Sequence, residues 1–181
     1  MTELATAPKS TNAYGVLTEP KTLKIERLLP GPIDRIWNYL TDGELRRLWL
    51  AAGPMVMEVG STFELVWRND ELTDPPGRRP DGFGEEHRMQ GEITELDPPH
   101  KLAITWSESG GVTFELESRG EEVLLTLTHR GIPNRGYLLS VSAGWHMHLD
   151  IMAARLKGGN PAPFWDGWAR LKADYDKRLP A

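Results

Sequence analysis

The chain has 181 residues, of which 39% are apolar and 26% are charged, and its formal net charge is -5. This length suits one domain with a sizeable core, the composition is too apolar for wholesale disorder, and the negative charge leaves no basic excess to neutralise the phosphates of a nucleic acid. Because the chain contains no cysteine, disulfides, thiolate metal sites and a cysteine nucleophile are excluded.

The first segment, residues 1–21, is expected to be a disordered tail. It is rich in alanine, threonine, serine, proline and charged residues and shows no apolar period, so it cannot offset the entropy lost on ordering. The remaining residues, 22–181, are expected to form a single domain.

The domain is expected to open with a strand and two short helices. The strand, residues 22–29, carries apolar side chains at alternate positions, with Arg27 as the exception. Pro32 favours the first turn of a helix, and apolar residues at helical spacing continue it to Leu40. Asp42 is a suitable N-cap for the second short helix.

A series of short strands with tight turns follows, which predicts an antiparallel meander with one packed face and one solvated face. Its strands are expected over residues 55–59, 61–67, 87–96, 101–106, 112–117 and 123–127. Residues 69–84 interrupt the series as a loop insertion, because three prolines and three glycines break either regular structure.

Two helices close the predicted domain. Over residues 140–156 the apolar period changes from two to 3.6, which predicts a long helix that covers the apolar face of the sheet. The glycines at 158 and 159 end that helix, and an extra C-terminal helix is expected over residues 164–178. The order of elements predicts an α+β fold with about six or seven strands.

Four segments within this order together resemble a known family. They are GSTFEL from Gly60, GEITELDPPHKLAITW from Gly91, VTFELE from Val112 running into LTLTHRG, and GWHMHLD from Gly144. In these segments the chain is similar to the bacterial proteins named after the activator of the ninety-kilodalton heat-shock-protein ATPase, of the START-like or SRPBCC superfamily. The similarity covers roughly residues 22–156, and the family's double glycine is Gly60-Ser61 here.

The resemblance implies a helix-grip fold, in which a curved antiparallel sheet wraps around a long C-terminal helix and leaves a cavity between them. The superfamily includes lipid carriers, hormone and pigment binders and polyketide cyclases, so the fold alone does not select a function.

Tryptophans on the inner faces of the expected elements are the best indication of function. Core packing would explain any one of them, but a curved sheet and one helix do not easily fill the space between them, and a gap lined by rings binds apolar molecules. We therefore expect a site for a small apolar or amphipathic ligand, to which a buried indole N–H could also donate. The expected lining is Phe63, Trp67, Met89, Trp106, Phe114, Trp145, Leu149 and Met152.

Polar residues offer weaker hypotheses. Arg27 could meet an acid group of a ligand or extend to the edge of the sheet. His146 and Asp150 are helical neighbours and are expected to hydrogen-bond, whereas His148 points elsewhere on the helix, so we expect no metal site. The Glu85-Glu86-His87 run could include a carboxyl group with a raised pKa, or form a solvated face. No cofactor and no catalytic residue are assigned.

Two other functions stay open. An enzyme of the cyclase or aromatase kind would need a polar group deep in the cavity, for which His146 and His87 are the candidates. A chaperone-related protein–protein adaptor would dock a partner through the outer sheet face or the terminal helix, where Trp165 and Trp168 could form a lid or a dimer contact. We expect a cytoplasmic monomer or homodimer, without a membrane span and without nucleic acid as a partner.

Overall fold

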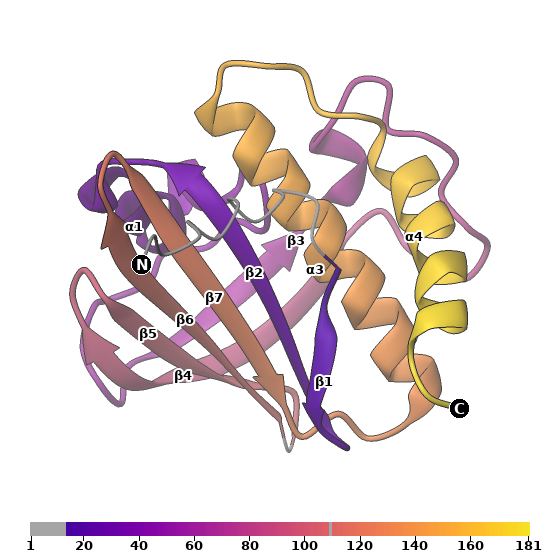
Figure 1. Cartoon of the computed structure of the whole chain (residues 1–181), viewed down its shortest axis with the longest axis horizontal. Coiled ribbons are helices and arrows are strands. Elements are labelled where there is room, and N and C mark those ends of the chain that lie inside the picture. The colour runs from indigo at the N-terminus through magenta and orange to yellow at the C-terminus, as the bar shows by residue number, and fades with distance from the viewer. Residues whose placement is uncertain (1–13, 109) are drawn as a thin grey trace, which may run out of the picture.

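The computed structural model describes residues 14–108 and 110–181 (Figure 1). Its strands are β1 (Val16–Glu19), β2 (Thr22–Pro30), β3 (Thr62–Trp67), β4 (His87–Asp97), β5 (Lys101–Trp106), β6 (Gly110–Arg119) and β7 (Glu122–Arg130). Its helices are α1 (Ile33–Thr41), α2 (Gly43–Arg46), the short 3-10 helix η1 (Asn69–Glu71), α3 (Arg135–Leu156) and α4 (Phe164–Arg178).

One antiparallel sheet contains all of these strands, in the order β1-β2-β7-β6-β5-β4-β3. The sheet curves around α3, and α4 lies beside α3 on the side away from the sheet (Figure 1). This arrangement is the helix-grip fold of the α+β class, so the predicted fold is confirmed. The predicted helix over residues 164–178 corresponds to α4.

Two details of the predicted layout are wrong. The tail was expected to reach residue 21, but β1 pairs with β2, and Val16 lies opposite Lys24. The first part of that tail, residues 1–13, lies outside the described residues. Residues 55–59 do not form a strand, and Val56 and Val59 are exposed. The alternation is real, because Met55 and Met57 are half-buried against the core, but no strand among the described residues pairs with this segment.

The core forms where the inner faces of β2 and β7 meet α3. Ile25 lies opposite Leu127 in the register, and both side chains are at most 1% exposed. Helix α3 begins at an N-cap, where the side chain of Asn134 accepts a hydrogen bond from the backbone N–H of Tyr137. Most residues of α3 are buried, and they lie on more than one face of the helix, because the sheet covers one face and α4 covers another.

Candidate functional site

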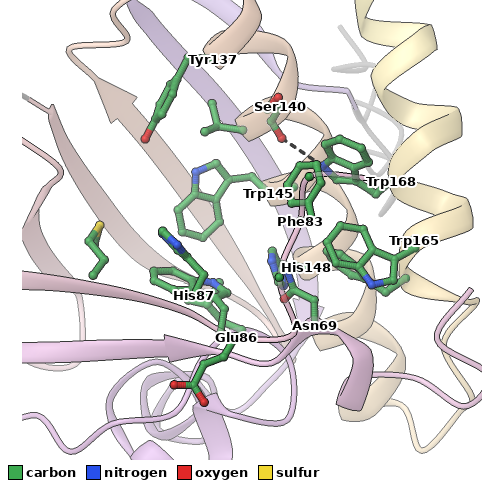
Figure 2. Close-up of a pocket in the computed structure, with 18 of the residues that line it drawn as sticks. Asn69, Phe83, Glu86, His87, Tyr137, Ser140, Trp145, His148, Trp165 and Trp168 are labelled. Carbon is green, nitrogen blue, oxygen red and sulfur yellow. Dashed lines mark hydrogen bonds between the residues drawn. The ribbon is translucent and has the colours of Figure 1, made fainter. Parts of the chain in front are cut away.

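A cavity of about 370 Å³ lies between the N-terminal half of α3, α4, the sheet end of β3 to β5 and the loop that follows η1. Figure 2 shows aromatic side chains from these separate elements turned toward the same space. The described residues that line the cavity are Leu50, Trp67, Asn69, Gly82, Phe83, Gly84, Glu85, Glu86, His87, Met89, Trp106, Ser107, Tyr137, Ser140, Val141, Gly144, Trp145, His148, Phe164, Trp165 and Trp168.

Indole rings form two of its walls. On the sheet side, the ring of Trp106 lies 5.5 Å from that of Trp67 and 5.1 Å from that of Trp145. On the α4 side, the rings of Trp165 and Trp168 lie 5.9 Å apart. Phe83 packs against both of the latter, at 5.3 and 5.2 Å, and so brings the long loop to the cavity.

Half of the predicted lining is in the cavity wall. Trp67, Met89, Trp106 and Trp145 line the cavity, and their contact with a ligand stays a prediction. The other four predicted residues do not line it, so the predicted set needs correction.

Each of these four is instead part of the packed core. Leu149 and Met152 are fully buried in the C-terminal half of α3, which the sheet covers closely, and Phe114 packs against the ring of Trp145 at 5.8 Å. Phe63 lies opposite Gly91, and a Cβ atom on that glycine would stand 2.6 Å from the Phe63 ring. The phenyl group therefore fills the space above the glycine rather than facing the cavity.

The residues of α3 that line the cavity are three or four positions apart and share one helical face; they are Tyr137, Ser140, Val141, Gly144, Trp145 and His148. The apolar period of this helix did not identify Gly144 and His148 as lining residues, because it marks a single face of the helix as covered. Trp165 and Trp168 were considered for a lid or a dimer contact, and both are buried within this chain as part of the cavity wall. The three-residue spacing that places them on one face of α4 was the available signal.

Four indole N–H groups in the wall donate to protein acceptors. That of Trp106 donates to the hydroxyl of Tyr137 over 3.0 Å, and that of Trp168 to the carbonyl of Ser140 over 3.2 Å. The remaining two are Trp145 to Nδ1 of His129 at 3.0 Å and Trp165 to Asp70 at 2.6 Å. These four N–H groups therefore already have protein partners, and among the indoles of the wall only that of Trp67 is left to donate to a ligand, as far as the described residues show.

His148 presents a hydrogen-bond acceptor to the cavity. Its Nδ1 lies 2.8 Å from the backbone carbonyl oxygen of Trp49, which can only accept, so Nδ1 carries the proton. Burial lowers the pKa of His148 to about 4, although the bond to Trp49 opposes that shift, and the ring is neutral at pH 7. Nε2 is then an unprotonated acceptor, and no hydrogen bond to it occurs among residues 14–108 and 110–181. Asn69, also in the wall, has a buried Oδ1 without a partner in the same part of the chain.

Two acidic residues, Glu85 and Glu86, are among the residues that line the cavity. Glu86 is paired with Arg88 and Arg68. The hydrogen bond from Arg88 lowers the pKa of this carboxyl group, so the raised pKa considered for this run is not found for Glu86. The ring of His87 lies 5.6 Å from that of Trp67. No lysine or arginine is among the described residues that line the cavity.

A separate polar network, away from the cavity, contains the other predicted residues. Nη2 of Arg27 lies 3.2 Å from Asp150, and Nε2 of His146 lies 3.5 Å from the second oxygen of that carboxylate. Nδ1 of His146 lies 2.9 Å from the hydroxyl of Tyr175. The expected His146–Asp150 contact is present, between a buried imidazole and a half-buried carboxylate, and neither Arg27 nor His146 lines the cavity. They are therefore not placed to meet a ligand there.

Neither a metal cluster nor a membrane helix is found in the described ranges. No three histidine, aspartate or glutamate side chains there are grouped to hold a metal ion. None of the helices formed by these residues has both the length and the apolar character that spanning a membrane requires.

The family model described as Activator of Hsp90 ATPase homolog 1-like protein matches residues 30–157, which is more than half of the chain. No curated protein matches the chain. A protein from Bordetella parapertussis, solved by NMR, is 35% identical, with a TM-score of 0.78 over 98% of this chain and 97% of that one.

Two more distant solved structures are similar in fold. The crystal structure of CalU16 from Micromonospora echinospora is 22% identical, with a TM-score of 0.64 over 86% of each chain. A conserved protein of unknown function from Enterococcus faecalis is 18% identical, with a TM-score of 0.66 over 88% of this chain and 86% of that one.

Proposed function

We propose that this chain, which belongs to the family of Activator of Hsp90 ATPase homolog 1-like proteins, binds a small apolar or amphipathic molecule in the cavity beside α3. The observation that carries the proposal is the aromatic wall, in which five indole rings surround about 370 Å³ of space. Ligand sites of small molecules have this range of volume and this apolar, aromatic character. The flat rings favour an aromatic ligand, because offset and edge-on ring contacts add to the binding free energy that burial of the ligand contributes.

A second candidate is an enzyme of the cyclase or aromatase kind that uses the same cavity. One observation favours it, which is the unprotonated Nε2 of His148, a group of the type that acts as a general base. An adaptor function has no comparable support. The exposed large apolar residues in the described part are Val16, Val56, Val59 and Phe83, and scattered exposure of this kind is ordinary. A cytoplasmic location and the choice between monomer and homodimer stay predictions.

The test uses a substitution that fills the cavity without disturbing the fold. Gly144 lies in the middle of α3 and lines the cavity, and a Cβ atom there would meet only Nε1 of Trp168, at 4.0 Å. Gly144→Leu therefore extends a side chain into the cavity while it replaces a poor helix former. Gly136→Leu is the matched control, because Gly136 lies in the same helix, is exposed and does not line the cavity.

Binding is followed by the tryptophan fluorescence of the protein during titration with naphthalene derivatives, and by native mass spectrometry of the freshly purified chain. The unmodified chain and Gly144→Leu should melt at similar temperatures, and Gly144→Leu should bind the probe at least tenfold more weakly. The control should bind as the unmodified chain does. Equal binding by all three proteins, or no binding by any of them, would contradict the proposal.

A further inference from the structure

We propose that the cavity selects a neutral aromatic molecule that carries a hydroxyl group, and that this hydroxyl donates a hydrogen bond to Nε2 of His148. This inference rests on the proposed binding function and specifies the class of ligand. It follows from which polar atoms of the wall already have partners and which do not.

Most of the indole donors of the wall are in use. Four of the five indole N–H groups are bonded to protein acceptors, so an acceptor group on a ligand finds few indole partners. Trp67 is the exception, since its N–H has no hydrogen bond within the described residues. A polar group left without a partner in an apolar site weakens binding, so a ligand should match the atoms that are still open.

The open atom placed best for recognition is an acceptor. His148 is 6% exposed, its ring is held against Phe164 with 5.0 Å between ring centroids, and its Nδ1 is fixed by the carbonyl of Trp49. The ring therefore cannot exchange its two nitrogens without breaking that bond. This open acceptor favours a ligand that donates.

The wall offers no cationic side chain to an anion. No lysine or arginine lies among the described lining residues, Glu85 contributes a carboxylate, and the carboxylate of Glu86 is already paired with Arg68 and Arg88. A carboxylate ligand, such as a fatty acid, would enter an apolar space without a counter-charge, which is costly. A hydroxyl is neutral, donates to His148 and keeps lone pairs that can accept in turn, whereas an ammonium group can only donate.

The experiment compares four probes of one shape by fluorescence titration at pH 7. They are 2-naphthol, which donates; 2-methylnaphthalene, which has no polar group; 2-methoxynaphthalene, which only accepts; and 2-naphthoate, which is an anion. We expect 2-naphthol to bind about tenfold more tightly than the methyl and methoxy compounds, and 2-naphthoate to bind most weakly. Equal Kd values for 2-naphthol and 2-methylnaphthalene, or preferred binding of 2-naphthoate, would overturn the inference while leaving the binding function intact. Failure of all four probes to bind would contradict the binding function itself, and the inference with it.

His148→Asn isolates the proposed contact. The asparagine amide can still donate to the carbonyl of Trp49, as Nδ1 does, but it lacks the atom in the place of Nε2. This variant should lose the tenfold preference for 2-naphthol and bind 2-methylnaphthalene as before. His146→Asn, the same change on the same helix outside the cavity, should keep the preference. A preference that survives in folded His148→Asn would overturn the inference.

A second measurement tests the hydrogen bond to Nε2 of His148 even if His148→Asn does not fold. In the unmodified protein labelled with ¹⁵N in its histidines, the Nε2 resonance of His148 should be that of an unprotonated nitrogen. It should shift when 2-naphthol binds and stay in place with 2-methylnaphthalene. The same response to both probes would overturn the inference.

Discussion

The indole N–H of Trp145 donates to Nδ1 of His129 over 3.0 Å, and this bond joins α3 to β7 beside the cavity. Trp145 lines the cavity, whereas His129 is fully buried. The tryptophan therefore belongs both to the cavity wall and to the core, and the bond fixes the orientation of its ring.

Replacing Trp145 by phenylalanine should destabilise the protein by about 1–3 kcal/mol, because the buried Nδ1 of His129 loses its donor. Nε2 of the same ring already has no partner in the described part of the chain, so no alternative bond compensates. Urea unfolding of Trp145→Phe, His129→Leu and the double variant measures this. The double variant should be more stable than the sum of the two single losses predicts, and strict additivity would show that the bond contributes little.

Three buried histidines should make stability depend on pH. Burial lowers the pKa of His129 and of His148 to about 4, and burial together with the charge of Arg27 lowers that of His146 to about 3. The unfolded chain titrates near 6.5, so between pH 6.5 and 4 it binds more protons than the folded chain. The neutral, buried rings therefore contribute fully to the free energy of unfolding above pH 6.5, and this contribution is lost as the pH falls toward 4.

The expected slope is about 1 kcal/mol per pH unit for each of these histidines. Urea unfolding at pH 7, 6 and 5 measures it, above the range where most carboxylates titrate. His148→Asn should have a shallower slope than the unmodified chain, whatever its stability at pH 7. A stability that is constant from pH 7 to 5 would show that these rings take up protons in the folded chain as readily as in the unfolded chain, and that burial does not lower their pKa.

Removal of β1 should lower the melting temperature by about 5–10 °C relative to a chain that starts at Tyr14, which corresponds to a loss of a few kcal/mol. The hydroxyl of Tyr14 donates to Asp174 over 2.9 Å, and the backbone N–H of Gly15 donates to Tyr175 over 2.8 Å. A chain that starts at Lys21 loses both bonds and the pairing with β2. Equal melting temperatures for the two truncated chains would show that this segment contributes nothing to stability.

Asp150→Ala should destabilise the protein by about 2–3 kcal/mol, because it removes a half-buried carboxylate that pairs with the fully buried guanidinium of Arg27, which keeps its bond to the backbone carbonyl of Glu26. Glu44→Ala is the matched control, since the Glu44–Arg47 pair is exposed and should cost less than about 1 kcal/mol. Urea unfolding measures both. A small loss for Asp150→Ala would show that water or another group replaces the carboxylate.

Local sequence pattern was sufficient for most of the elements. Alternating apolar residues predict the strands that become β2 to β7, the N-cap at Asp42 marks the start of α2, and the change of period predicts α3. These features depend on neighbours in sequence, which the chain itself displays. Residues 16–19 carry no such pattern, because β1 is an edge strand. It is held by its pairing with β2 and by the hydrogen bonds of Tyr14 and Gly15 to α4.

The cavity was only half predictable, for a physical reason. Periodicity identifies a residue that faces inward, as for Trp67, Met89, Trp106 and Trp145, but it does not distinguish an inward residue that packs from one that borders a gap. That distinction depends on how far the sheet approaches α3, and the approach is close around Met152 and wide around Gly144.

The sequence by itself determined the fold class, the covering helix and the supply of indole rings. Only the tertiary structure decided that α4 and the loop at Phe83 complete the cavity, and that His148 rather than His146 faces it. Both histidines lie on one helix two residues apart, so their roles depend on which neighbours each meets. His148 meets Trp49 and Phe164, whereas His146 meets Tyr175 in addition to Asp150 of its own helix. Trp49, Phe164 and Tyr175 come from segments that only folding brings to α3.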